Sequence, residues 1–418
     1  MCGGGPWGPG EWTDDTQMAL LIAGSLLDHD GLDVGDIFRR FRAWLAAGPK
    51  DVGISTREVL SSGRSWDRAA AEHFAAGNRA AGNGSLMRTT PAAIYFAPKG
   101  TSDSVDAARR ISALTHGDPA AGDGCAIFHR LLRAALDGTD PLAELDVAIR
   151  DIPADRRTKW QRVLAADWTP KQATEPNGAV WPTLATAVWA LRRYKTFEQS
   201  MREVIDIGGD TDTIAAVSGG LLGAVHGIQS IPSRWTTVLH GQLPGHHNDA
   251  PDLAGLMALA DRLDGHAGAP DFGPADPPVI EPREVEPGLW LANLPGVQTA
   301  SPDTMVISLC RTFGRIRHEL RRQVYLTDDD SNLDLQAVLN DVIGTIEAAR
   351  NEHRPVLVHC FGGESRTGLI LRAWLARSHQ LTPSQATAEA MRLWPATARW
   401  NSSFEHALEV WADAGTHR

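Results

Sequence analysis

The chain has 418 residues, which at about 150 residues per domain predicts two or three domains. Its 43% hydrophobic and 22% charged residues are typical of globular proteins and exclude a wholly disordered chain. The formal net charge of −11 disfavours broad binding to polyanions, so we expect no stable binding to nucleic acid and no membrane association.

The cysteines and the apolar runs indicate the compartment. Only four cysteines occur, and their spacing fits neither a disulfide framework nor a zinc site: Cys2, Cys125, Cys310 and Cys360. No apolar run reaches the roughly 18 residues that a membrane-spanning helix needs. We therefore expect a cytoplasmic protein.

The first part of the chain, residues 1–264, is predicted to be an all-α domain. Its periodic segments are long, rich in Ala and Leu, and poor in alternating β-branched residues: 16–27, 123–136, 184–193 and 213–227. Convincing strand patterns are hard to find there, and helices without strands pack into an α-helical domain.

Residues 265–288 are predicted to be a linker, because six prolines and several glycines interrupt any helix or central strand. Residues 289–418 then alternate short β-prone runs (305–309, 323–326 and 356–359) with helical runs (335–350, 368–378 and 383–393). This order predicts an α/β domain with a mostly parallel sheet.

Two acidic clusters precede two of the predicted helices of the first domain. One is Thr13-Asp14-Asp15, and the other is Asp210-Thr211-Asp212-Thr213. Asp and Thr are favoured helix N-caps, so capping alone explains either cluster taken singly. If the two loops meet, the repulsion between their carboxylates needs a cation, and hard oxygen donors of this kind suit Mg²⁺ or Mn²⁺.

Four motifs in this order resemble those of the ADP-ribosylglycohydrolases, over roughly residues 10–230. They are WTDDTQMAL (12–20), GNGSLMRTTP (82–91), THGDP (115–119) and IDIGGDTDTIAAVSGGLLGAVHG (205–227). The resemblance implies an orthogonal all-α bundle with two magnesium or manganese ions, which orient the ribose hydroxyls and a water molecule for cleavage of the anomeric bond.

The resemblance also implies the residues of this site. The metal ligands would be Thr13, Asp14, Asp15, Asp210, Asp212 and Thr213, and the ADP-ribose cleft would be lined by Gly82, Asn83, Gly84 and Ser85, with His116 nearby. For His116, a structural histidine is an equally good interpretation. The chain departs from the family ahead of Trp12: a helix with a Gly-Asp-x-Leu-Gly signature and a following acidic residue is missing there, and Glu11 is a weak substitute.

The strongest single motif of the second domain is His359-Cys360-x5-Arg366, which a chain of this composition would contain by chance roughly 0.01 times. A loop between a strand and a helix can direct its backbone N–H groups inward, and the helix N-terminus adds positive charge. Cys360 would then be a thiolate nucleophile, and Arg366 would bind two phosphate oxygens. A buried cysteine in an inactive loop is the alternative.

The loop resembles that of the dual-specificity cysteine phosphatases, over roughly residues 283–415. In this interpretation Gly362 and Gly363 allow the loop to bind phosphate, Thr367 assists departure of the sulfur, and His359 orders the loop. The resemblance implies an aspartate about 30 residues upstream that protonates the leaving oxygen. Asp328 is our choice, and Asp329 or Asp330 are the alternatives.

The sequence therefore predicts a bifunctional hydrolase. One domain would remove ADP-ribose from a modified protein or nucleic acid, and the other would hydrolyse a phosphate monoester on a phosphorylated substrate through a phosphocysteine. Because the upstream carboxylate is missing, the alternative is that the first domain only binds ADP-ribose and targets an active phosphatase.

Overall fold

The computed structural model describes residues 3–78, 81–246, 251–265, 275–312, 315–316, 318–398 and 401–415. They form two compact units, one made of residues 1–225 and 238–269 and the other of residues 226–237 and 270–418. The part of the predicted linker from 266 to 274 lies outside the described residues. Residues 283–286 of that predicted linker form a strand, β1.

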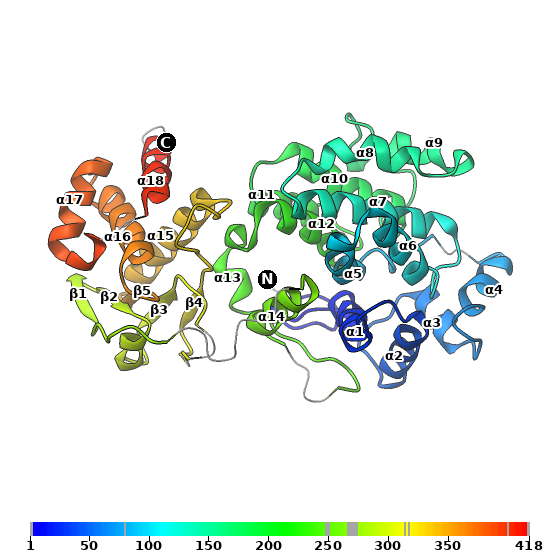
Figure 1. The fold of residues 1–418 in the computed structure, drawn as a ribbon, viewed down its shortest axis with the longest axis horizontal. Helices are drawn as coiled ribbons and strands as arrows, with labels where there is room; N and C mark the ends of the chain where they lie inside the picture. The colour runs from blue at the N-terminus through cyan, green and yellow to red at the C-terminus, as the bar shows by residue number, and fades with distance from the viewer. Residues whose placement is uncertain are drawn as a thin grey trace. The chain divides into compact units, whose positions relative to one another are not determined.

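The first unit is helical, as predicted (Figure 1). The residues described here form no strand longer than an isolated bridge. The helices are α1 (Asp14–His29), α2 (Val34–Ala46), α3 (Ile54–Ser61), α4 (Ala69–Ala75), α5 (Thr90–Phe96), α6 (Thr101–Ser112), α7 (Pro119–Leu136), α8 (Pro141–Arg150), α9 (Ala154–Val163), α10 (Val180–Arg193), α11 (Phe197–Asp206), α12 (Thr211–His226) and α14 (Leu253–Leu263), with short 3-10 turns at Ala97–Lys99 and Pro170–Gln172.

The core of this unit lies around α1 and α7, whose inward faces are almost completely buried. Helix α7 begins where Asp118 accepts a hydrogen bond from the Ala120 backbone N–H at 2.9 Å and Pro119 occupies the first turn. Helices α1 and α12 both begin at an acidic cluster, so each directs a carboxylate-bearing end toward the other. This arrangement positions the first site.

The second unit is built on a five-stranded sheet in the order β1-β2-β5-β3-β4. Its strands are β1 (Arg283–Glu286), β2 (Leu289–Asn293), β3 (Met305–Ser308), β4 (Arg321–Gln323) and β5 (Val356–Cys360). Only β1 is antiparallel to its neighbour, which confirms a mostly parallel sheet. The helices are α15 (Leu335–Asn351), α16 (Ser365–Ser378), α17 (Pro383–Leu393) and α18 (Ser402–Gly415), with 3-10 turns at Pro295–Thr299 and Pro395–Ala398.

A short segment ahead of the predicted linker also belongs to this second unit. It contains the 3-10 turn Ile228–Ser230 and helix α13 (Ser233–Thr236), which pack on α15 and β4. Asp341 of α15 fixes the segment, because its carboxylate accepts from the Ser233 backbone N–H at 2.9 Å and from Arg234 at 3.0 Å. No change in composition at residues 226–237 indicates that this segment packs on the second unit.

One predicted strand lies elsewhere in the structure. The run 323–326 was expected to be a strand, but β4 covers Arg321–Gln323 and its pairing with β3 ends at Gln323. Beyond that point Val324 and Leu326 remain buried and donate backbone hydrogen bonds to Ser308 and Leu309, at 2.8 and 3.3 Å. The apolar character of 323–326 therefore reflects core packing at the edge of the sheet.

Candidate functional site

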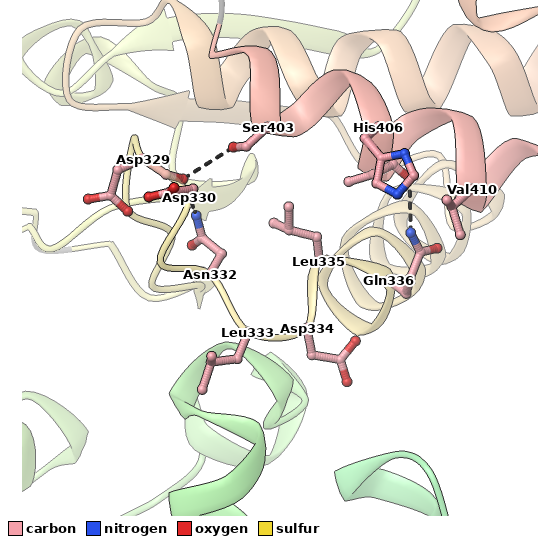
Figure 2. Close-up of a pocket in the computed structure, with 11 residues that line it drawn as sticks. Asp329, Asp330, Asn332, Leu333, Asp334, Leu335, Gln336, Ser403, His406 and Val410 are labelled. Carbon is pink, nitrogen blue, oxygen red and sulfur yellow. Dashed lines mark hydrogen bonds between the residues drawn. The ribbon is translucent and has the colours of Figure 1, made fainter. Parts of the chain in front are cut away.

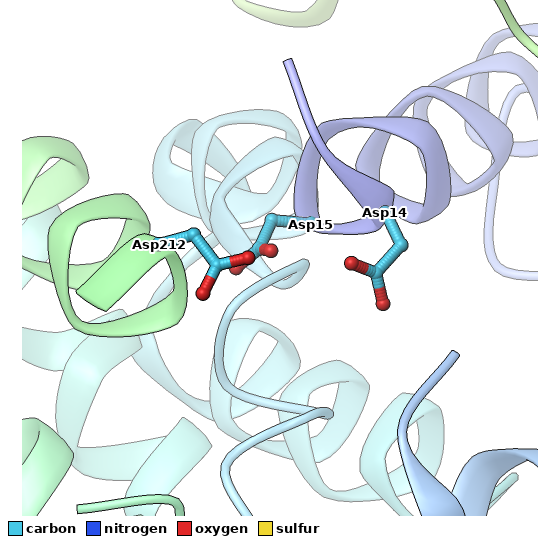
Figure 3. Close-up of side chains that lie close together, drawn as sticks. All are labelled: Asp14, Asp15 and Asp212. Atoms are coloured by element: carbon cyan, nitrogen blue, oxygen red, sulfur yellow. The ribbon is translucent and has the colours of Figure 1, made fainter. Parts of the chain in front are cut away.

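Side chains from α1 and α12 form a compact group of carboxylates in the first unit. Oxygens of Asp14, Asp15 and Asp212 all lie within 4.8 Å of one another, although about 200 residues separate the two clusters (Figure 3). Asp14 and Asp15 are buried in the first turn of α1, and Asp212 lies in the first turn of α12. The two acidic loops therefore meet.

The electrostatics of this group are unfavourable without a cation. Burial, followed by the charges of Asp51, Asp212 and Asp210, raises the pKa of Asp14 to about 7. Burial and the charge of Asp14 raise the pKa of Asp15 well above its usual value. Burial, followed by the charge of Asp210, also raises the pKa of Asp212.

One oxygen of this group lacks a partner. Asp15 Oδ2 accepts from Thr13 Oγ1 at 2.7 Å, but the buried Asp15 Oδ1 has no hydrogen-bond partner among the residues with described positions. Buried acceptors without donors are rare in native proteins. Three close carboxylates with an unpaired oxygen fit a hard divalent cation such as Mg²⁺ or Mn²⁺.

The other predicted ligands have different surroundings. Thr13 donates to Asp15, and the Thr213 hydroxyl contacts Met87 Sδ at 3.9 Å. Asp210 is held beside the group by Asn83, whose Nδ2 donates to Asp210 Oδ2 at 2.8 Å. Of the six predicted ligands, the structure thus places Asp14, Asp15 and Asp212 together and the other three around them.

The loop at Gly82–Ser85 is shaped by His116. A Cβ at Gly82 or Gly84 would lie 3.3 or 3.2 Å from the imidazole ring, so a larger residue at either position would require the ring to move by a few tenths of an ångström. Burial, helped by the charges of Arg88 and His73, lowers the pKa of His116 to about 3, so the ring is neutral. Ser85 is buried and accepts from Ser112 Oγ at 2.8 Å, which anchors the loop.

Asn177 is a site residue that the sequence analysis missed. Its Oδ1 accepts from the Asp210 backbone N–H at 3.2 Å, and its Nδ2 donates to the Gly208 carbonyl at 2.7 Å. Its own carbonyl accepts from Asn83 Nδ2 at 3.2 Å. Asn177 therefore ties the second acidic loop to the Gly82–Ser85 loop. The only signal in the sequence is an Asn-Gly pair, which equally indicates an ordinary turn.

The second site is the loop between β5 and α16. Cys360 ends β5 and is 1% exposed, and the loop returns to the helix within four residues. Gly363 has φ of +74°, which favours glycine, and a Cβ there would lie 3.0 Å from the Ala292 carbonyl oxygen. Trp394 Nε1 donates to the Gly363 carbonyl at 2.7 Å and fixes the loop from outside.

The residues that flank Cys360 are held by the sheet. His359 is fully buried, with Nε2 2.7 Å from Ser308 Oγ and Nδ1 3.2 Å from the Cys360 carbonyl oxygen. Burial lowers the pKa of His359 to about 4, so this histidine is a neutral support. The carboxylate carbon of Glu364 lies 3.7 Å from the position that a Cβ on Gly362 would take, so a carboxylate stands near the loop.

The first turn of α16 carries two buried donors without partners. Arg366 Nη1 donates to the Leu326 carbonyl at 2.9 Å, but its Nε has no partner among the described residues. The hydroxyl of Thr367, which is completely buried, also has none in that part of the chain. Unpaired donors at a helix N-terminus beside a cysteine fit an anion such as phosphate.

The three candidate acids, Asp328, Asp329 and Asp330, lie in an exposed loop that follows Leu326. Asp329 Oδ1 accepts from the backbone N–H and the hydroxyl of Ser331, at 2.9 and 2.5 Å. These bonds, with smaller contributions from Thr327 and Arg366, lower the pKa of Asp329. Asp328 stays our choice for the general acid, with Asp329 and Asp330 as the alternatives.

Comparisons with known proteins match both units. Residues 1–270 match the model of the ADP-ribosylglycohydrolase family, and residues 304–412 match that of the dual specificity phosphatase catalytic domain. Among the helices with described positions, none combines the length and the apolar character needed to cross a membrane.

Two curated relatives and one solved structure are similar to the first unit. ADP-ribosylarginine hydrolase Tri1 of Pseudomonas putida is 30% identical, over 56% of this chain and 64% of its own, so the chain spans just under two thirds of that relative. ADP-ribosyl-[dinitrogen reductase] glycohydrolase of Rhodospirillum rubrum is 31% identical, over 62% of this chain and 84% of its own. A structure titled "ADP-ribosylglycohydrolase-related protein complex" is 32% identical, over 64% of this chain and 86% of its own, with a TM-score of 0.49.

Proposed function

The chain belongs to the ADP-ribosylglycohydrolase family and carries a dual specificity phosphatase catalytic domain C-terminal to the glycohydrolase domain. From this we propose that it is a bifunctional hydrolase. One activity removes ADP-ribose from a modified macromolecule, and the other hydrolyses a phosphate monoester. We assign them to separate domains, residues 1–264 and 289–418, in a cytoplasmic protein.

The observation that supports the first activity is the close approach of the Asp14, Asp15 and Asp212 carboxylates, one of whose oxygens, Asp15 Oδ1, has no hydrogen-bond partner among the described residues. These residues would hold Mg²⁺ or Mn²⁺, with Asp210, Thr13 and Thr213 beside them. The bound metal would supply an activated water molecule and orient the ribose hydroxyls. The Gly82–Ser85 loop would bind the ADP-ribose, with the neutral His116 ring as its support.

In the second activity, the Cys360 thiolate attacks the phosphorus atom, a phosphorus–sulfur bond forms, and the phosphorus–oxygen bond to the rest of the substrate breaks. Asp328 gives its proton to the departing oxygen. Water then attacks the phosphorus and gives a proton to the Asp328 carboxylate, the phosphorus–sulfur bond breaks, and inorganic phosphate and the Cys360 thiolate are released. Arg366 binds two phosphate oxygens, Thr367 donates to the departing sulfur, and Gly362 and Gly363 let the loop close around the phosphate. The unpaired donors of Arg366 and Thr367 support this assignment.

Two variants of the full chain test both activities at once. Relatives named for ADP-ribosylarginine and for ADP-ribosylated dinitrogen reductase make an ADP-ribosylarginine protein the first substrate to use, and p-nitrophenyl phosphate serves for the second site. We expect Cys360→Ser to abolish p-nitrophenyl phosphate hydrolysis and to leave ADP-ribose release intact. We expect Asp15→Asn to do the reverse.

The outcomes separate the alternatives. Calorimetric binding of ADP-ribose without release from ADP-ribosylated arginine or serine would refute the glycohydrolase activity and favour a targeting module. Release that persists in chelator, or that survives Asp15→Asn, would refute the metal site. Phosphate release by Cys360→Ser would refute the phosphocysteine.

A further inference from the structure

Residues 226–237, which we call the 226–237 segment, lie ahead of the predicted linker and yet belong to the second unit. They are fixed there by hydrogen bonds to Asp341 of α15. The match to the dual specificity phosphatase domain begins at residue 304, so it does not include them. What the segment does for the phosphatase depends on which part of that domain it touches.

The 226–237 segment touches the end of the loop that carries the candidate acids. Gly227 has φ of +76°, and a Cβ there would lie 3.1 Å from Leu333 Cδ1 and 3.6 Å from Leu333 Cβ. Figure 2 shows that the Leu333 side chain points away from α18. Burial lowers the pKa of His226, and the charge of Asp334 opposes this in part. Leu333 and Asp334 therefore lie next to the first two residues of the segment.

Residues 327–332, which we call the acid loop, are closed by their own hydrogen bonds. Asn332 Oδ1 accepts from the Thr327 backbone N–H at 3.0 Å, and Asn332 Nδ2 donates to the carbonyls of Thr327 and Asp329, both at 3.1 Å. Because Asn332 directly precedes Leu333, a shift of Leu333 displaces Asn332 and, through these bonds, the rest of the loop. Asp328 lies within this loop. The position of Leu333 therefore influences the position of Asp328.

The other contacts of the acid loop join it to the phosphate-binding side of the domain. Arg366 Nη1 donates to the Leu326 carbonyl at 2.9 Å, just before the loop. Ser403 Oγ of α18 donates to the Asp329 carbonyl at 3.3 Å (Figure 2). The loop is thus held at its start by a phosphate-binding residue and at its end by the 226–237 segment.

The contact between Gly227 and Leu333 is small. Leu333 remains 63% exposed, so the contact contributes little to the free energy of unfolding. It can still affect the rate, because a general acid must lie within hydrogen-bond reach of the departing oxygen, and a misplacement of about 1 Å can cost roughly 100-fold.

We propose that the 226–237 segment positions the acid loop of the phosphatase through the contact between Gly227 and Leu333. This inference rests on the proposed phosphatase activity and adds residues to it from ahead of the linker. Gly227 and Leu333 act through Asp328 and are positioning residues. It follows that the phosphatase uses residues from both sides of the linker.

Two substrates with different leaving groups measure whether the acid is in place. p-Nitrophenolate is a weak base and departs with little protonation, whereas phenolate is a stronger base and needs the proton of Asp328. In the full chain, Asp328→Asn should lower kcat/KM for phenyl phosphate about 10-fold more than for p-nitrophenyl phosphate, which sets the scale. A change that only reduces the amount of folded protein would lower both values by the same factor.

Two substitutions then perturb the contact from its two sides. Gly227→Ala adds a Cβ that displaces Leu333, and Leu333→Ala removes the contact. We expect each to lower kcat/KM for phenyl phosphate about 3- to 10-fold and that for p-nitrophenyl phosphate less than about 2-fold. In the Leu333→Ala background, Gly227→Ala should change the ratio of the two values little further, because the side chain that its Cβ displaces is gone.

Met391→Ala is the matched control, because Met391 is an apolar side chain of α17 that is 45% exposed. It should leave the ratio unchanged. Leu333→Ala truncates an exposed side chain, so it keeps the test decisive if Gly227→Ala does not fold.

The results separate this inference from the proposed function. If the wild-type chain does not hydrolyse p-nitrophenyl phosphate, or if Asp328→Asn affects both substrates equally, the proposed phosphatase mechanism fails and the inference with it. If both requirements are met but Leu333→Ala leaves the ratio unchanged, the inference alone is overturned. An undiminished effect of Gly227→Ala in the Leu333→Ala background would overturn it as well.

Discussion

Replacing Asp14 with Asn is expected to stabilise the metal-free protein at alkaline pH. Burial and three neighbouring carboxylates raise the pKa of this carboxyl group from 3.8 to about 7. At about 1.36 kcal/mol per pH unit, this corresponds to about 4 kcal/mol of lost folding stability once Asp14 is ionised. Asparagine has nearly the same shape and carries no charge.

The sign follows from proton binding. Between about pH 4 and pH 7 the folded protein holds the Asp14 proton and the unfolded chain does not, so the free energy of unfolding falls as the pH rises through this range. The stabilisation by Asp14→Asn should therefore be near zero at pH 4 and should reach about 4 kcal/mol at pH 8. Saturating Mg²⁺ should reverse the order, because the wild type gains binding free energy that the variant loses.

Hydrogen exchange of peptides from α1 in the full chain, with chelator or with Mg²⁺, measures this local stability at both pH values. Asp106→Asn is a suitable control, because that carboxylate is exposed and makes only a surface ion pair with Arg110, so its effect should stay below about 0.5 kcal/mol. Destabilisation by Asp14→Asn in chelator at pH 8 would refute the reasoning, since it would mean that the protein itself compensates the charge.

Three further substitutions test other parts of the structure. Asn177→Ala should weaken Mg²⁺ binding about 10-fold in calorimetry, because Asp210 and the loop before it lose their support; unchanged affinity would contradict this. Gly363→Ala should cost roughly 1–3 kcal/mol in urea unfolding of the second unit and should raise KM for p-nitrophenyl phosphate, because φ is +74°; an unaffected KM would count against the loop geometry. Arg234→Ala should destabilise the second unit by about 1 kcal/mol, and the same loss in an Asp341→Asn background would show that the two residues do not interact.

Local patterns were enough for the elements that depend on local physics. The helical periodicity predicted α1, α7, α10 and α12, and the run 383–393 predicted α17 with the bounds that the structure has. The strands β1 and β2 and the helix α18 were not predicted. β1 lies among prolines, and its burial depends on pairing with β2, which no local pattern encodes.

The candidate sites divide in the same way. The sequence by itself predicted the two chemistries, because their signatures are local: carboxylates directly before two helices, and a cysteine at the end of an apolar run, six residues ahead of Arg366. Only the tertiary structure decided which carboxylates meet, that Asn177 joins the two loops, and that residues 226–237 pack on α15. Those facts depend on contacts between distant residues, whose free energies come from shared burial and hydrogen bonding.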